Sequence, residues 1–95
     1  MGVDAALARI AAFVGDAPFY FSVDVDVLDP AEFSAVSDPV QGGISVDALT
    51  ALARGVLAQA PVAADIVEYN SLRDPDGGAL RRLDPLLKEY AQWFV

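Results

Sequence analysis

The stretch FYFSVDVDVLDP, residues 19–30, decides the fold class of this chain. Apolar residues alternate with polar ones along most of it, which is the pattern of a β-strand with one buried face. The Asp-Pro pair at its end stops a strand, because proline lacks the N–H that a strand ladder needs. The sequence therefore predicts a strand over residues 19–27, with Asp24 and Asp26 on the same face near its carboxyl end.

Helical patterns lie on both sides of this strand. The expected elements are, in order, a helix over residues 3–14 that ends at Gly15, the strand, a loop over 31–44, a helix that begins after Ser45, a strand over 64–69, and a closing helix over 79–95 that breaks or restarts at Asp84 and Pro85. Alternating helices and strands predict the α/β class, with two parallel strands in a right-handed βαβ unit.

The composition excludes several kinds of site. The 95 residues form one domain or part of one and include no cysteine and no histidine. Disulfides, thiolate sites, a histidine general base and the commonest zinc ligand are therefore excluded. The formal net charge of −8 argues against nucleic acid and anionic membranes as partners. No apolar run approaches the roughly 20 residues that span a bilayer, and no signal-peptide pattern is present, so we expect a cytoplasmic protein.

The Asp24-x-Asp26 pair can be interpreted in three ways. Two ionised carboxylates this close repel each other, and a divalent cation relieves that repulsion most directly. Oxygen ligands favour Mg²⁺, Mn²⁺ or Ca²⁺. Alternatively, both aspartates face solvent. A phosphoryl-transfer site is the third interpretation, but it needs a nearby lysine, and Lys88, the only lysine, lies in the last predicted helix.

Polar residues also lie at the end of the second predicted strand. Ligands of open parallel sheets gather beyond the carboxyl ends of the strands. The residues expected at or near such ends are Asp24, Asp26, Asp29, Glu68 and Asn70. This convergence is the strongest indication of function that the residues give by themselves.

Three motifs resemble those of the ureohydrolases, the family of arginase, agmatinase, guanidinobutyrase and formiminoglutamase. FSVDVDVLDP (residues 21–30) resembles S-x-D-x-D-x-x-D-P, GGIS (42–45) resembles G-G-[LI]-[ST], and DIVEYN (65–70) resembles D-[IV]-x-E-x-N. The resemblance runs from Asp4 to Val95. It implies a partial three-layer arginase-like fold, with residues 1–95 as a single segment similar to the C-terminal third of a ureohydrolase domain.

The resemblance also implies a chemistry. Family members use two Mn²⁺ ions to activate water for attack on a guanidinium or amidine-type carbon. By resemblance, Asp24 bridges the two ions, Asp26 ligates one of them, and Glu68 pairs with the substrate guanidinium. Asp29 is expected to organise the turn after the strand. No residue of this chain is assigned a catalytic proton-transfer role.

Two departures from the family limit these expectations. The family loop close to P-G-x-G-T-P is replaced by SAVSDP (residues 34–39), in which Ser37 resembles the formiminoglutamase branch. The other metal ligands, two histidines and two aspartates, belong to an upstream portion that has no counterpart here. A full manganese site therefore requires a complementary portion, either a second chain or the rest of a longer enzyme, and activity of this chain alone is not expected.

Other functions stay open at this point. One alternative is a truncated, catalytically inert α/β module that acts structurally or as an oligomer, because a sheet of two strands leaves edges to cover by self-association. Another is a simple cation binder that uses Asp24 and Asp26 alone.

Overall fold

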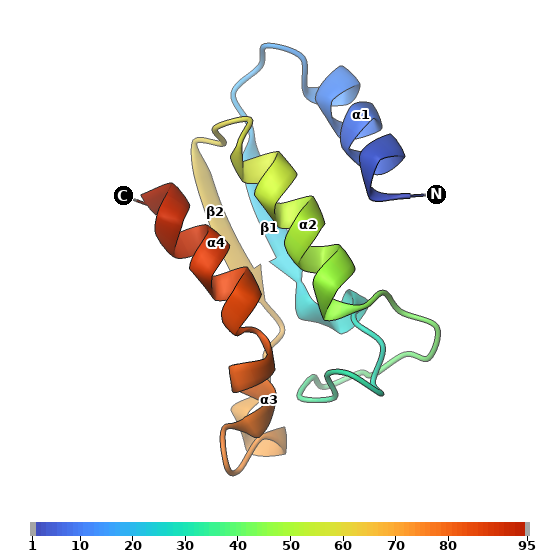
Figure 1. Cartoon of the computed structure of the whole chain (residues 1–95). Coiled ribbons are helices and arrows are strands. Elements are labelled where there is room, and N and C mark those ends of the chain that lie inside the picture. Colours follow the sequence, from blue (N-terminus) through green and yellow to red (C-terminus); the bar gives the residue numbers. More distant parts are fainter. Residues whose placement is uncertain (1, 95) are drawn as a thin grey trace.

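The computed structural model describes residues 2–94. The elements (Figure 1) are α1 (Val3–Val14), β1 (Tyr20–Asp24), the 3₁₀ turn η1 (Val25–Val27), α2 (Val46–Leu57), β2 (Ala63–Val67), the 3₁₀ turn η2 (Ser71–Arg73), α3 (Gly78–Arg82) and α4 (Asp84–Phe94). The predicted element order is confirmed. The expected end of the last helix at Val95 lies outside the described residues.

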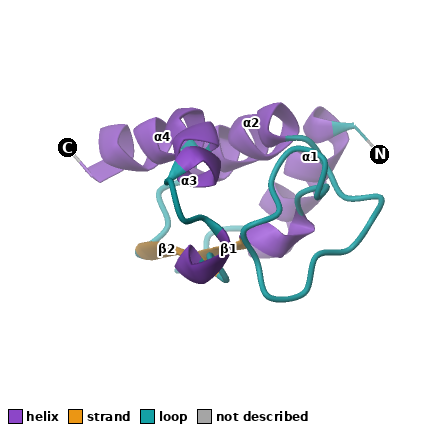
Figure 2. Cartoon of the chain, turned by 90° about the horizontal axis from the view of Figure 1, so that it is seen from below, coloured by secondary structure: helices purple, strands orange, loops and turns teal. Residues whose placement is uncertain are grey.

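The two strands pair in parallel, from Tyr20 opposite Ala63 to Asp24 opposite Val67. Helix α2 connects them, and Figure 2 shows α2 and α4 together on one side of the sheet. This arrangement confirms the α/β class and the βαβ unit. The apolar core lies between the sheet and these helices; it comprises Val23, Val25, Leu28, Phe33, Ala35, Val36, Val46, Leu49, Ala53, Leu57, Leu83, Leu86 and Tyr90. Within residues 2–94 the sheet has only these two strands, so both of its edges are unpaired.

The helix boundaries follow from their capping residues. Gly15 closes α1 with φ +55°, a left-handed value that favours glycine. The Ser45 hydroxyl begins α2 by accepting a 3.0 Å hydrogen bond from the Ala48 N–H. The closing helix breaks between Arg82 and Asp84, as the Asp-Pro pair predicts.

The predicted strand over residues 19–27 is too long. β1 ends at Asp24, because the Asp24 carboxylate accepts a hydrogen bond from the Asp26 N–H and the chain turns into η1. Asp26 therefore lies on this turn and not beside Asp24 on one strand face. Val27 is 42% exposed, whereas the strand pattern placed it on the buried face. The predicted strand over residues 64–69 is similarly shifted, since β2 ends at Val67.

The loop over residues 31–44 contains no helix or strand but is anchored at both ends. Asp29 accepts hydrogen bonds from the Ala31 N–H at 2.9 Å and from the Gly42 N–H at 3.1 Å. These bonds confirm that Asp29 organises the turn after β1. In the first half of the loop, Phe33, Ala35 and Val36 are almost fully buried.

Gly43 lets this loop return against the end of β1. The neighbouring Ile44 N–H donates to the Val27 carbonyl at 2.9 Å, and the Ile44 carbonyl accepts from the Asp29 N–H at 3.0 Å. A Cβ at position 43 would overlap the Val27 carbonyl oxygen and lie 2.6 Å from the Asp29 nitrogen. The second glycine of the GGIS motif is thus required by close backbone approach.

None of the helices described here is both long and apolar enough to cross a membrane.

Candidate functional site

The expected site residues lie at the carboxyl ends of the two strands. Asp24 is the last residue of β1, Asp26 lies on η1, and Glu68 directly follows β2. Asp24 and Asp26 are half-buried, whereas Glu68 is exposed. The parallel pairing of Asp24 with Val67 brings these segments together, since Glu68 comes next in the chain.

Negative charge is concentrated around Asp26. Its pKa is raised above the ordinary value, first because its protonated carboxyl donates a hydrogen bond to Asp24, and then because of burial and of repulsion by Asp24, Glu68 and Asp38. Three carboxylates from three segments of the chain therefore act on Asp26. A bound cation would relieve this repulsion.

The donors present fit a hard divalent metal ion. Asp24 and Asp26 offer only carboxylate oxygens, which are the ligands that Mg²⁺ and Mn²⁺ accept. Residues 2–94 nevertheless contain no group of three acidic side chains close enough together to hold a metal ion by themselves. The site as described thus supplies some, but not all, of the ligands that such an ion requires.

Glu68 has a left-handed backbone, with φ +74°. A non-glycine residue adopts this conformation at a cost of about 1 kcal/mol or more, and such residues cluster at functional sites. The strand pattern gives no signal of this turn. The turn at Glu68 directs the chain away from the sheet immediately after Val67, beside the acidic residues around Asp26.

Asp38 is a further acidic residue of this site that sequence reasoning missed. It lies in the loop over residues 31–44 and acts on Asp26 through charge repulsion. The only available signal was the departure of SAVSDP from the family loop, which puts an acidic residue directly before Pro39.

A second polar cluster lies on the face of the sheet opposite α2. The Asp65 carboxylate on β2 accepts hydrogen bonds from the Tyr20 hydroxyl and, at 2.6 Å, from the Ser22 hydroxyl on β1. The bond from Ser22 and then that from Tyr20 lower the pKa of Asp65. This cluster connects the two strands at the Ser22–Asp65 pair, two positions before Asp24.

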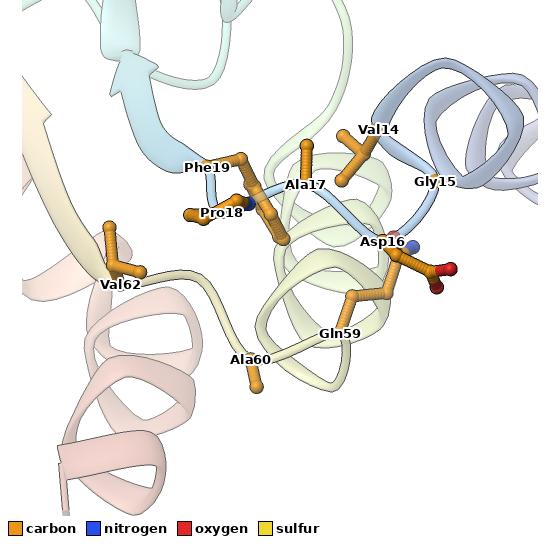
Figure 3. A pocket seen from close by; sticks show the side chains of 9 residues that line it. All are labelled: Val14, Gly15, Asp16, Ala17, Pro18, Phe19, Gln59, Ala60 and Val62. Atoms are coloured by element: carbon orange, nitrogen blue, oxygen red, sulfur yellow. The ribbon is translucent and has the colours of Figure 1, made fainter.

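Two hollows accompany the sheet. The hollow in Figure 3 lies at the amino ends of the strands, between Phe19, Ala60 and Val62, and includes none of the expected site residues. The second is an apolar groove of about 380 Å³ along β1, lined mainly by Ile10, Phe21, Val23, Val27, Ile44, Leu49, Leu52 and Val56. We call it the β1 groove. It lies beside the strand that carries Asp24.

The model of the arginase family matches residues 1–83. The chain belongs to the arginase family. An agmatinase of Salmonella paratyphi B is 42% identical over 67 residues, which are 70% of this chain and 22% of that protein. A hypothetical agmatinase from Burkholderia thailandensis superposes with a TM-score of 0.85 at 30% identity, over 98% of this chain and 30% of the other.

A third relative extends the likeness in fold. Formiminoglutamase from Trypanosoma cruzi, in a structure that contains Mn²⁺, superposes with a TM-score of 0.76 at 21% identity, over 96% of this chain and 32% of the other. These comparisons confirm the arginase-like α/β fold expected from the motifs. This arginase-family chain spans about a fifth of the length of the curated agmatinases that it matches.

Proposed function

We propose that this chain is a segment of a manganese-dependent, cytoplasmic ureohydrolase and supplies part of its active site. Asp24 and Asp26 are its metal ligands, and Glu68 pairs with the substrate. The reaction is hydrolysis of a guanidinium or amidine-type C–N bond in a small molecule. The remaining ligands come from a complementary portion, which corresponds to the part of the ureohydrolase domain that precedes residues 1–95.

The observation that carries this proposal is the gathering of carboxylates around Asp26. Glu68 and Asp38 lie on separate segments of the chain. Their charge repulsion raises the pKa of Asp26 in addition to the effect of Asp24. Such a group at the carboxyl ends of parallel strands is suited to cations. Membership of the arginase family supports the choice of Mn²⁺ and a guanidinium or amidinium group as those cations.

The chain's own residues have separate tasks in this proposal. Asp24 and Asp26 hold metal through hard oxygen donors, and Glu68 accepts N–H hydrogen bonds from the substrate and so orients its central carbon. Bound Mn²⁺ would supply Lewis-acid assistance and lower the pKa of a water molecule.

The β1 groove and the free edge of β1 support the need for a partner. The groove has an almost wholly apolar lining, and Val27 and Ile44 in it are 42% and 37% exposed. An unpaired strand edge beside exposed apolar side chains is a typical surface for adding another strand. The relatives are several times longer than this chain, so a complementary portion has ample length to fill it.

The test is complementation in trans. The chain is combined with the part of an agmatinase that it does not match, and urea release from agmatine and other guanidino compounds is measured with and without Mn²⁺. We expect Mn²⁺-dependent release that disappears in Asp24→Ala. Asp16→Asn, an exposed acid at the other end of the sheet, is the matched control and should remain active. No release from any such mixture would contradict the proposal.

Metal binding gives a second readout that does not depend on turnover. Electron paramagnetic resonance of the mixture should show bound Mn²⁺ that is lost in Asp24→Ala. Glu68→Gln should retain the bound Mn²⁺ and lose most of the urea release, because its task is to hold substrate.

A second candidate function is an inert module that acts through self-association. Several large apolar side chains are strongly exposed, including Phe13 (93%), Leu72 (91%) and Phe94 (79%), which favours covering by other copies. Size-exclusion chromatography with light scattering tests this candidate. A monodisperse, folded monomer would argue against it.

A further inference from the structure

Asn70 is the last residue of the DIVEYN motif, and it has no role in the proposed function. All four of its polar groups form hydrogen bonds. Its N–H donates to the Ala35 carbonyl at 2.7 Å, and its carbonyl accepts from the Arg73 N–H at 3.1 Å. Its side-chain amide donates to the Ser37 hydroxyl at 3.2 Å and accepts from the Leu72 N–H at 3.0 Å.

Two of these groups, the backbone N–H and the side-chain NH₂ of Asn70, donate to the loop over residues 31–44. Through the Ala35 carbonyl and the Ser37 hydroxyl, Asn70 fastens the loop to the exit of β2. Ala35 itself is fully buried, so this attachment is made to a residue of the core. We call the Asn70–Ser37 side-chain contact the loop clamp.

The loop clamp joins two residues that are close in sequence to acidic residues of the site. Asp38 directly follows Ser37, and Glu68 is two residues before Asn70. Both act on Asp26 by charge repulsion, from separate segments of the chain. Fixing Ser37 to Asn70 therefore fixes Asp38 relative to Glu68.

The left-handed backbone of Glu68 fits the same account. The chain is held before this residue by the pairing of Val67 with Asp24 and after it by the Asn70 N–H. Strained backbone persists where the surroundings over-determine it. The turn at Glu68 thus lies between two anchored points of the chain, Val67 and Asn70.

We propose that Asn70 is a positioning residue, whose loop clamp sets Asp38 and Glu68 relative to Asp26 and keeps Glu68 in its left-handed turn. The use of these carboxylates by a cationic substrate rests on the proposed function. The placement itself does not, and it can be measured on the 95-residue chain alone.

Two substitutions remove the loop clamp in different ways. Ser37→Ala deletes only the acceptor, from an exposed side chain, so the variant is expected to fold. Asn70→Ser keeps a short acceptor for the Leu72 N–H but cannot reach Ser37. Ser34→Ala, at an exposed serine of the same loop with no side-chain hydrogen bond in the structure, is the matched control.

The measurement is NMR of the labelled chain. The three-bond HN–Hα coupling and the Cα shift of Glu68 report its φ angle, and amide hydrogen exchange of Asn70 reports its bond to Ala35. In Ser37→Ala and Asn70→Ser we expect Glu68 to leave the left-handed region in part of the population. We also expect the Asn70 amide to exchange about fivefold faster, as for the loss of one ordinary hydrogen bond. Ser34→Ala should match the wild type.

A purely structural role for Asn70 would give a different result. The melting temperature of Asn70→Ser would fall while the Glu68 signals stayed unchanged in both variants, and this outcome overturns the proposal. Where the complemented protein releases urea, Ser37→Ala should also raise KM for the guanidino substrate; an unchanged KM would overturn the role in the site. If no mixture releases urea, the proposed function fails, while the NMR result decides the placement independently.

Discussion

The backbone N–H of Asp26 donates a 3.0 Å hydrogen bond to Oδ1 of Asp24. This bond stops β1 and starts η1, so the carboxylate proposed to bind metal is also the one that turns the chain. The two tasks can be separated by substitution. Asparagine at position 24 keeps a side-chain oxygen that can accept the hydrogen bond, but its side chain is uncharged and does not ionise.

Asp24→Asn is expected to lower the pKa of Asp26 toward its ordinary value. The hydrogen bond from the protonated Asp26 carboxyl to the Asp24 carboxylate is the largest cause of the raised pKa, and the substitution weakens it and removes the repulsion. Carbon-detected NMR titration of the Asp26 carboxyl measures the change. Glu68→Gln should lower the same pKa by less, because repulsion by Glu68 is a smaller cause. An equal or larger effect of Glu68→Gln would contradict this ranking.

Gly43→Ala is expected to lower the free energy of unfolding by about 1–3 kcal/mol, the range for overpacking at a fixed position. Its Cβ would meet backbone atoms of residues 27–29, which cannot rotate away as a side chain would. Urea unfolding followed by circular dichroism measures the loss. Gly42→Asn is the control: Gly42 has φ +85° with open space around it, and asparagine tolerates that conformation. A greater loss at Gly42 would contradict the steric explanation.

Asp74→Asn is expected to destabilise the turn into α3. The buried Asp74 carboxylate accepts hydrogen bonds from the Tyr69 hydroxyl at 2.7 Å and from the Ala79 and Leu80 N–H groups at 2.9 Å. Asparagine cannot satisfy all three donors, and it buries an NH₂ group. Asp76→Asn, at an exposed residue that accepts one backbone bond, should have a smaller effect on the melting temperature.

The same residue gives a pH dependence. Hydrogen bonding, first from Tyr69, lowers the pKa of Asp74 below its unfolded value of 3.8. The folded state therefore binds fewer protons than the unfolded state in the window below 3.8, and stability falls as pH falls through it. Acid unfolding of Asp74→Asn should show a shallower decline than the wild type. Identical midpoints of acid unfolding in Asp74→Asn and the wild type would contradict this role of Asp74 in the pH dependence of stability.

Tyr90→Phe is expected to change stability at high pH. Burial, and then repulsion by Asp65, raises the pKa of Tyr90 to about 12 from 10.0. Between these values the unfolded state loses the proton first, so the wild type loses stability by up to about 1.4 kcal/mol per pH unit from this group. Phenylalanine removes this contribution and also the 2.9 Å bond to the Asp65 carbonyl. The variant should be less stable at pH 7 but lose less between pH 10 and 12; parallel curves would contradict the assignment.

The sequence predicted the elements that packing and capping chemistry specify. Gly15, Ser45 and the Asp84-Pro85 pair mark helix boundaries by local chemistry, and the structure has the boundaries there. Asp29 was predicted to organise its turn because an aspartate before proline is typical of a capped turn, and its two bonds confirm this.

The geometry of the acidic residues could not be predicted in the same way. The Val-Asp alternation continues through Val27, but it does not reveal that the Asp24 side chain ends the strand by capping Asp26. The left-handed turn at Glu68 lies two residues before Asn70, which hydrogen-bonds to a loop far away in the sequence. Asp38 comes from that loop, so only the three-dimensional structure reveals its effect on Asp26.

The free edge of β1, with the apolar groove beside it, has a consequence for the chain inside a cell. A strand edge and exposed apolar side chains that no partner covers are surfaces that chaperones and proteases recognise, and local opening there exposes the chain to cleavage. Under the proposed function, the lifetime of this polypeptide would depend on the concentration of the complementary portion that completes its sheet. Degradation of unassembled copies would hold the two portions at matched amounts, without any control at the level of synthesis.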